Sequence, residues 1–147
     1  MKCPAGSTTD GNDPVRLFHE FSTPDAASDG RAEILLGRAS ATESFPLFGF
    51  DIADYETLFD EKLELFLHLQ GGGPTTWSGK SRPALHEQTL HPRMREGGIP
   101  TWIGVGCSPD SVIRAARHGL PLTMAIIGGT PQRFAGNVRL YELAIHD

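Results

Sequence analysis

The sequence contains few cysteines and no recognisable set of metal ligands. Only Cys3 and Cys107 occur among the 147 residues, and they lie far apart and outside any C-x-x-C motif. This spacing favours neither a disulfide-stapled fold nor a cysteine-based zinc site. The six histidines form neither an H-x-H nor an H-E-x-x-H motif. We therefore expect no bound metal.

Positive charge and long apolar runs are also scarce. The chain has 13 Lys and Arg against 18 Asp and Glu, which gives a formal net charge of −5, and it has no basic stripe. Nucleic-acid binding depends on clustered cations that neutralise phosphates, so we expect no nucleic-acid partner. No apolar run approaches the roughly 18 residues of a membrane span, and the N-terminus does not read as a targeting signal. We expect a soluble, cytoplasmic protein without a membrane partner.

The length and composition are those of one ordinary domain, so we expect a single domain over residues 1–147. Apolar periodicity and turn signals then divide the chain. We expect an irregular lead-in over residues 1–12, a helix that Asp13 caps and Pro24 ends, a strand over 32–36, a helix with an apolar stripe from Tyr55 to Leu67 that Asp51 or Asp54 caps, a strand over 101–105, a helix from Ser108 to Gly119, a strand over 120–127 and a helix over 131–144.

Between the second helix and the second strand, residues 71–98 are polar and broken by Pro and Gly. We interpret this stretch as an insertion, with a small hairpin near Thr76 and Trp77. Strands that alternate with helices favour a parallel sheet. The predicted fold class is therefore α/β, with about three parallel strands and one insertion.

One glycine-rich segment, G-P-T-T-W-S-G-K-S over residues 73–81, has some features of a phosphate loop. The glycine that such a loop needs five residues before Gly79 is replaced by Pro74, and the segment follows a helix instead of a strand. Because a phosphate loop requires the order strand, glycine turn, helix, we reject this interpretation.

A more promising turn lies between the strand over 101–105 and the next helix. Gly106 and Cys107 precede Ser108 at the helix start, and this turn directs free N–H groups and the positive helix end outward. The hydroxyls of Ser108 and Ser111 would add donors to an anion bound there. The alternative is that Ser108 only caps the helix.

Two further strand ends carry groups that suit an anion. Arg38 follows the strand over 32–36, and a guanidinium donates two parallel hydrogen bonds to phosphate. The alternative is an ion pair with Glu43 or Asp51. The pair Gly128 and Gly129 follows the third strand and offers either a backbone cradle or a plain turn.

Taken together, several motifs resemble the bacterial luciferase-like, flavin-dependent monooxygenase family, from about Asp13 to Tyr141. The resemblance implies a TIM barrel with residues 32–36, 101–105 and 120–127 as its fourth, fifth and sixth strands. The motifs that carry it are I-L-L-G-R-A-S at 34–40, E-S-F-P-L-F-G at 43–49, P-T-W-I-G-V-G at 100–106, G-L-P at 119–121 and A-I-I-G-G at 125–129.

The resemblance also implies a cofactor, either FMN or a deazaflavin, and places residues around it. Arg38 would lie near the flavin phosphate, Ser108 and Ser111 at the phosphate end, and Cys107 beside the flavin. It implies no catalytic residue for this chain, because the early barrel strands, which supply that residue in some members, are not recognisable. The implied cofactor-binding residues are Arg38, Ser40, Gly106, Cys107, Ser108, Ser111, Gly128 and Gly129.

The implied function is an FMN-dependent monooxygenase that oxidises a small organic substrate with O2 through a flavin peroxide. A deazaflavin-dependent hydride-transfer enzyme is one alternative. A complete barrel takes about 250 residues, so the chain has room only for an incomplete one. A second alternative is therefore a truncated, inactive relative that assembles with itself or with a complementing chain.

Overall fold

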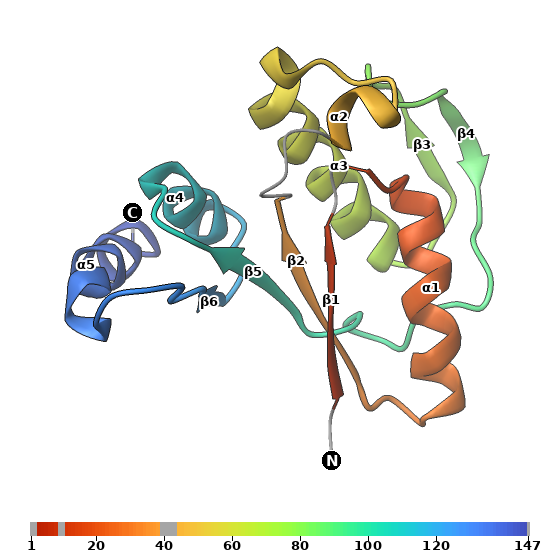
Figure 1. Ribbon diagram of the computed structural model, residues 1–147. Coiled ribbons are helices and arrows are strands. Elements are labelled where there is room, and N and C mark those ends of the chain that lie inside the picture. The colour runs from red at the N-terminus through yellow and green to blue at the C-terminus, as the bar shows by residue number, and fades with distance from the viewer. Residues whose placement is uncertain (1–2, 9–10, 39–43, 147) are drawn as a thin grey trace.

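The computed structural model describes residues 3–8, 11–38 and 44–146. Four parallel strands form its main sheet, in the order β1-β2-β5-β6 (Figure 1). The predicted α/β class is therefore confirmed, and the described strands do not close into a barrel. The strands are β1 (Cys3–Thr8), β2 (Ala32–Gly37), β5 (Thr101–Val105) and β6 (Leu122–Met124).

Helices connect these strands and cover one face of the sheet. Long helices alternate with the strands, as the sequence predicts, and two 3-10 turns precede α3 and α5. The helical elements are α1 (Pro14–Ala27), α2 (Ser44–Leu47), η1 (Ile52–Asp54), α3 (Tyr55–Gln70), α4 (Pro109–Arg117), η2 (Pro131–Phe134) and α5 (Ala135–Ala144).

The core lies between the sheet and the helices. Ile34 and Leu36 of β2 and Ile103 and Val105 of β5 are at most 1% exposed, whereas the residues between them in each strand are only half-buried. Each fully buried side chain of this kind contributes about 1.5–3 kcal/mol to folding. The helices supply the other core side chains, among them Leu17, Phe18, Phe59, Leu63, Phe66 and Val112.

Two predictions for the N-terminal region were wrong. Part of the predicted irregular lead-in is β1, which pairs with β2 over six residues from Cys3↔Ala32 to Thr8↔Gly37. The strand is hard to recognise because its sequence, C-P-A-G-S-T, lacks the apolar run of a typical buried parallel strand. Its pairing satisfies backbone groups of β2 that would otherwise form a sheet edge.

Pro24 does not end the first helix, which continues to Ala27. Proline removes one backbone donor, but tertiary contacts hold the last turn in place. Asp25 is 3% exposed and accepts a hydrogen bond from the backbone N–H of Ala32 at 3.3 Å, at the start of β2. The start of the helix is confirmed, since the Asp13 carboxylate accepts from the N–H of Val15 at 2.9 Å.

The remaining elements agree with the prediction except at their ends. The apolar stripe of α3 is confirmed, and Asp51 caps the preceding η1 by accepting from the N–H of Ala53 at 2.9 Å. The last strand is shorter than predicted: β6 ends at Met124, and the side chain of Ile127 is 91% exposed. The prediction from apolar composition alone made that strand too long. The C-terminal helix begins as the 3-10 turn η2.

Residues 71–98 contain an antiparallel hairpin of β3 (Thr75–Trp77) and β4 (Leu85–Gln88), as predicted. The loop between these strands is fixed to α3 by Glu61. Its carboxylate accepts from the backbone N–H groups of Lys80 and Ser81, both at 2.8 Å, and from the Ser81 hydroxyl. The glycine-rich segment therefore does bind an anion, but that anion is the protein's own side chain.

This arrangement makes the stability of the chain depend on pH. Burial alone would raise the pKa of Glu61, but the hydrogen bonds from Ser81 and from the two backbone N–H groups outweigh it and lower the pKa below its usual value of 4.5. A lowered pKa in the folded state stabilises the fold above the unfolded-state pKa. That stabilisation is lost as the pH falls through the folded-state pKa.

We expect Glu61→Gln to lower the free energy of unfolding by about 1–2 kcal/mol at neutral pH, because a charged acceptor of three hydrogen bonds becomes a neutral one. The difference between variant and wild type should shrink as the pH falls below 4.5. Urea unfolding followed by circular dichroism, at neutral pH and at pH values below 4.5, measures the free energy of unfolding of each variant. Glu64→Gln, at an exposed position on the same helix, is the matched control. Equal stability of the two variants at neutral pH would contradict this role of Glu61.

Candidate functional site

The predicted ligand-binding residues follow three neighbouring parallel strands. Arg38 comes directly after β2, Gly106 directly after β5, and Gly128 four residues after the end of β6. Because the three strands run in the same direction, their carboxyl ends meet at one edge of the sheet. Ligands of α/β proteins bind at this edge.

The structure brings Arg38 and Ser111 into direct contact across 73 residues of sequence. The Arg38 guanidinium donates through Nη2 to the Ser111 hydroxyl at 2.7 Å. Its Nη1 forms an ion pair with Glu56 on α3, and the guanidinium lies 4.7 Å from the centre of the Tyr55 ring. Among the described residues, the partners of Arg38 are therefore Ser111 and Glu56, and not Asp51, which is one of the two acids that the sequence suggested. Glu43 lies outside the described residues.

The first turn of α4 has no side-chain cap. Ser108 occupies the N-cap position with extended backbone angles of φ −79° and ψ 119°, but its hydroxyl forms no capping hydrogen bond. Gly106 and Cys107 in the preceding turn are exposed. The amide of Asn137 on α5 donates to the Gly106 carbonyl at 3.3 Å and so connects this turn to the last helix. The helix N-terminus can thus offer both backbone N–H groups and a hydroxyl.

Sequence reasoning missed a second arginine at the same place. Arg114 of α4 is 5% exposed, forms ion pairs with Glu56 and Asp60 of α3, and lies 5.1 Å from the centre of the Phe59 ring. Its Nη1 is buried and has no hydrogen-bond partner among the described residues. Together with Arg38, Arg114 completes a network of two cations and two carboxylates between α3 and α4.

Electrostatics in this network favour the charged forms. Burial alone would raise the pKa of Glu56, but the hydrogen bonds from Arg114 and Arg38 and their positive charges lower it. Burial alone would lower the pKa of Arg114, but Asp60 and Glu56 raise it. Glu56 and Arg114 are therefore both held in their charged forms. The network contains two arginines and two acids, so its formal charges balance.

One signal in the sequence could have found this network. Glu56 and Asp60 are four residues apart, and Ser111 and Arg114 are three apart, so each pair lies on one face of its helix. Acidic residues on one helix and an arginine on another suggest a contact once both helices are placed beside neighbouring strands. The order of the strands, which the sequence does not state, is needed to see it.

The other predicted residues are less closely connected. Gly128 and Gly129 adopt positive φ angles of 80° and 89°, which favour glycine. Within the described part of the chain, no hydrogen bond or ion pair joins them to Arg38 or Ser108. Ser40 lies outside the described residues. The catalytic residue remains unassigned, and no cluster of three potential metal ligands is found among the described residues.

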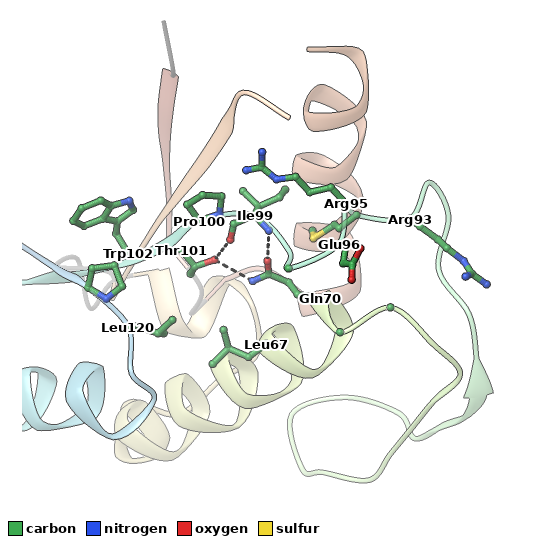
Figure 2. A pocket seen from close by; sticks show the side chains of 15 residues that line it. Leu67, Gln70, Arg93, Arg95, Glu96, Ile99, Pro100, Thr101, Trp102 and Leu120 are labelled. Carbon is green, nitrogen blue, oxygen red and sulfur yellow. Dashed lines mark hydrogen bonds between the residues drawn. The ribbon is translucent and has the colours of Figure 1, made fainter. Parts of the chain in front are cut away.

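A hollow of about 750 Å³ lies at the opposite, amino end of β5 and β6, beside the end of α3 (Figure 2). Gln70 closes its inner wall by donating to the Thr101 hydroxyl at 3.0 Å and accepting from the N–H of Ile99 at 2.7 Å. Arg93 points away from the apolar end of the hollow, where Trp102 lies. Since the polar groups of the inner wall are already paired, we place the functional site at the carboxyl edge.

No helix among the described residues is long and apolar enough to cross a membrane.

The structure is similar to the monooxygenase RslO1 from Streptomyces bottropensis, with a TM-score of 0.87 and 21% identity, over 99% of this chain and 45% of that one. It is also similar to the oxygenating constituent of 3,6-diketocamphane monooxygenase from Pseudomonas putida, solved in complex with FMN. That match has a TM-score of 0.80 and 12% identity, over 99% of this chain and 44% of that one.

A third similar structure is the coenzyme F420-dependent tetrahydromethanopterin reductase from Methanopyrus kandleri, with a TM-score of 0.77 and 18% identity, over 99% of this chain and 45% of that one. The chain thus spans less than half the length of each of these proteins, and at these identities the likeness shows a shared fold. The family model for luciferase-like monooxygenases matches residues 4–145. Because that match covers almost the whole sequence, the chain belongs to the luciferase-like monooxygenase family.

Proposed function

We propose that the carboxyl edge of this sheet holds the phosphate of a flavin-type cofactor. The observation that carries the proposal is the hydrogen bond from Arg38 to Ser111, beside the uncapped first turn of α4. A guanidinium, two hydroxyls and the N-terminal N–H groups of a helix are the donors that a phosphate needs. Arg38, Ser108 and Ser111 would bind the phosphate, and Gly106 leaves room for close approach of the backbone.

The hydrogen-bond donors at this edge fit a phosphate dianion, but the two arginines are already paired with carboxylates, which a phosphate would have to displace. Arg38 and Arg114 are already balanced by Glu56 and Asp60, so an added phosphate would compete with a carboxylate for Arg38. Glu56 is the group that can move, because its side chain is 51% exposed, whereas that of Arg38 is 13% exposed. The Glu56 carboxylate therefore pairs with Arg38 where the phosphate would, and it holds the guanidinium in position.

We further propose that the cofactor is FMN and that the intact protein is a monooxygenase acting on a small organic substrate and O2. When bound, the reduced flavin supplies the electrons that activate oxygen. The described residues bind and orient the phosphate end. A deazaflavin-dependent hydride transfer stays the second candidate, because the reductase similar to this chain depends on coenzyme F420. Copurification of one cofactor or the other separates the two, and a chain that binds neither would be an inactive relative.

The proposal predicts that removal of the guanidinium weakens binding of FMN more than binding of riboflavin, which lacks the phosphate. We expect Arg38→Ala to raise the Kd for FMN about 10- to 100-fold, because one charged hydrogen-bonding pair contributes about 1.5–3 kcal/mol. Quenching of flavin fluorescence on titration measures the Kd for FMN and the Kd for riboflavin. Arg117→Ala, at an exposed position on α4, removes the same charge and should leave both affinities unchanged. A wild-type chain that binds neither FMN nor a deazaflavin would overturn the proposal.

Competition between Glu56 and phosphate gives a second prediction, in which a substitution increases the affinity for FMN instead of lowering it. Glu56→Gln should increase FMN affinity about two- to fivefold, because a partly exposed ion pair contributes up to about 1 kcal/mol. Riboflavin binding should not change, and Glu64→Gln serves as the control at an exposed site on the same helix. A loss of FMN affinity in Glu56→Gln would mean that Glu56 supports the ligand-binding geometry and does not compete.

A further inference from the structure

We propose that Arg114 is a positioning residue that binds both oxygens of the Glu56 carboxylate when a phosphate displaces that carboxylate from Arg38. The inference rests on the proposed function and extends it, since it assigns a role to an arginine that does not contact the phosphate. Three features of the described structure support it: a carboxylate shared by two arginines, an unused donor on one of them, and the unequal exposure of the three side chains.

The first feature is the shared carboxylate. One oxygen of Glu56, Oε1, accepts from Nη1 of Arg38, and the other, Oε2, accepts from Nη2 of Arg114. A carboxylate and a guanidinium bind each other more strongly when two parallel hydrogen bonds join them. In its bridging position Glu56 therefore pairs with two arginines but reaches this preferred geometry with neither.

The second feature is the unequal use of the two guanidiniums. In Arg38 both terminal nitrogens already donate, Nη1 to Glu56 and Nη2 to the Ser111 hydroxyl. In Arg114, Nε donates to Asp60 and Nη2 to Glu56, while Nη1 is buried and has no hydrogen-bond partner among the described residues. Nη1 and Nη2 form one end of the planar guanidinium, where a carboxylate can bind through both oxygens. Arg114 is therefore the arginine with an unused nitrogen beside the one that binds Glu56.

The third feature is the difference in freedom to move. Arg114 is fixed, because its side chain is 6% exposed, is held by Asp60 and lies 5.1 Å from the centre of the Phe59 ring. The side chain of Arg38 is 13% exposed, whereas that of Glu56 is 51% exposed. Glu56 is thus the side chain that can shift, and it can move Oε1 to Nη1 of Arg114 while Oε2 stays on Nη2.

The shift would change the balance of hydrogen bonds at the site. Without a ligand, the buried Nη1 of Arg114 lacks an acceptor among the described residues. Once a phosphate accepts from Arg38, the displaced Glu56 can accept from that nitrogen. A buried donor without a partner is costly, so the new bond offsets part of the loss of the pair between Glu56 and Arg38. Arg114 would therefore make the exchange of anions at Arg38 easier.

The first test needs no flavin. Arg38→Met removes the guanidinium that binds Oε1 of Glu56, which a bound phosphate would do by competition. In a crystal structure of this variant we expect one oxygen of Glu56 at Nη1 of Arg114 and the other at Nη2, each at about 2.7–2.9 Å. A Glu56 side chain that turns into solvent and leaves Nη1 without a partner overturns the proposal.

The second test is a double-mutant cycle on the Kd for FMN. Lysine keeps the positive charge of Arg114 but lacks the planar pair of donors. We expect Arg114→Lys to raise the Kd for FMN about two- to fivefold, as for a partly exposed ion pair, and to leave the Kd for riboflavin unchanged. In the Glu56→Gln background no carboxylate is displaced, so the same substitution should change neither Kd. Arg117→Lys, at an exposed position on the same helix, is the matched control.

The cycle separates this role of Arg114 from two others. An equal rise in the Kd for FMN in both backgrounds would mean that Arg114 binds the phosphate directly. An equal rise for FMN and riboflavin would mean that Arg114→Lys only disturbs α4. Either result overturns the proposal. A wild-type chain that binds neither FMN nor a deazaflavin refutes the proposed function instead, and the structure of Arg38→Met then decides where Glu56 binds, as it does if circular dichroism shows that Arg114→Lys is unfolded.

Discussion

Parallel pairing of β2 with β5 is the constraint on which the candidate site depends. The two strands are separated by α3 and the β3–β4 hairpin in sequence, yet their register aligns Ile34 with Thr101 and Leu36 with Ile103. Once these residues are paired, Arg38 and the first turn of α4 must leave the sheet at the same edge. The contact between Arg38 and Ser111 is therefore a consequence of strand register and not of any local sequence motif.

The same register explains why the edge carries a charged network. Arg38 follows two core residues, Ile34 and Leu36, at intervals of two, so its side chain leaves the strand on the helix-covered side, between α3 and α4. A guanidinium placed there needs acceptors, because burial of an unpaired charge is costly. Glu56 meets this need for both arginines. The cost is a site whose positive charge is already neutralised, so the proposed phosphate would exchange with a carboxylate instead of simply adding to the site.

Much of this arrangement could be predicted from the sequence, for identifiable reasons. Ala32–Gly37 and Thr101–Val105 are short apolar runs with clear ends, so both strands and the residues that follow them could be placed. Arg38 and Ser111 are residue types that suit phosphate; Arg38 comes directly after β2, and Ser111 lies in the first turn of the helix that follows β5. The pairing between them follows from the parallel sheet, which the alternation of helices and strands also indicates.

What could not be predicted depends on tertiary contacts. β1 has no apolar run and exists because β2 offers it an edge. The helix passes Pro24 because buried Asp25 is held by the start of β2. Arg114 could be taken for an ordinary surface arginine until α4 is placed against α3. For β1 and Pro24, a local rule gave the wrong answer because a contact outside the element outweighed the local preference.

The distribution of paired and unpaired polar groups distinguishes the two ends of the sheet. At the amino end, Gln70 and Thr101 satisfy each other and the backbone of Ile99, so the inner wall of the hollow beside them offers a ligand few free polar groups. At the carboxyl end, Ser108 leaves the first turn of α4 uncapped and Arg114 retains a buried N–H without a partner among the described residues. Unsatisfied donors cost stability in a folded chain unless a ligand supplies the acceptor. The phosphate that we propose to bind at this end of the sheet would supply such an acceptor at the first turn of α4.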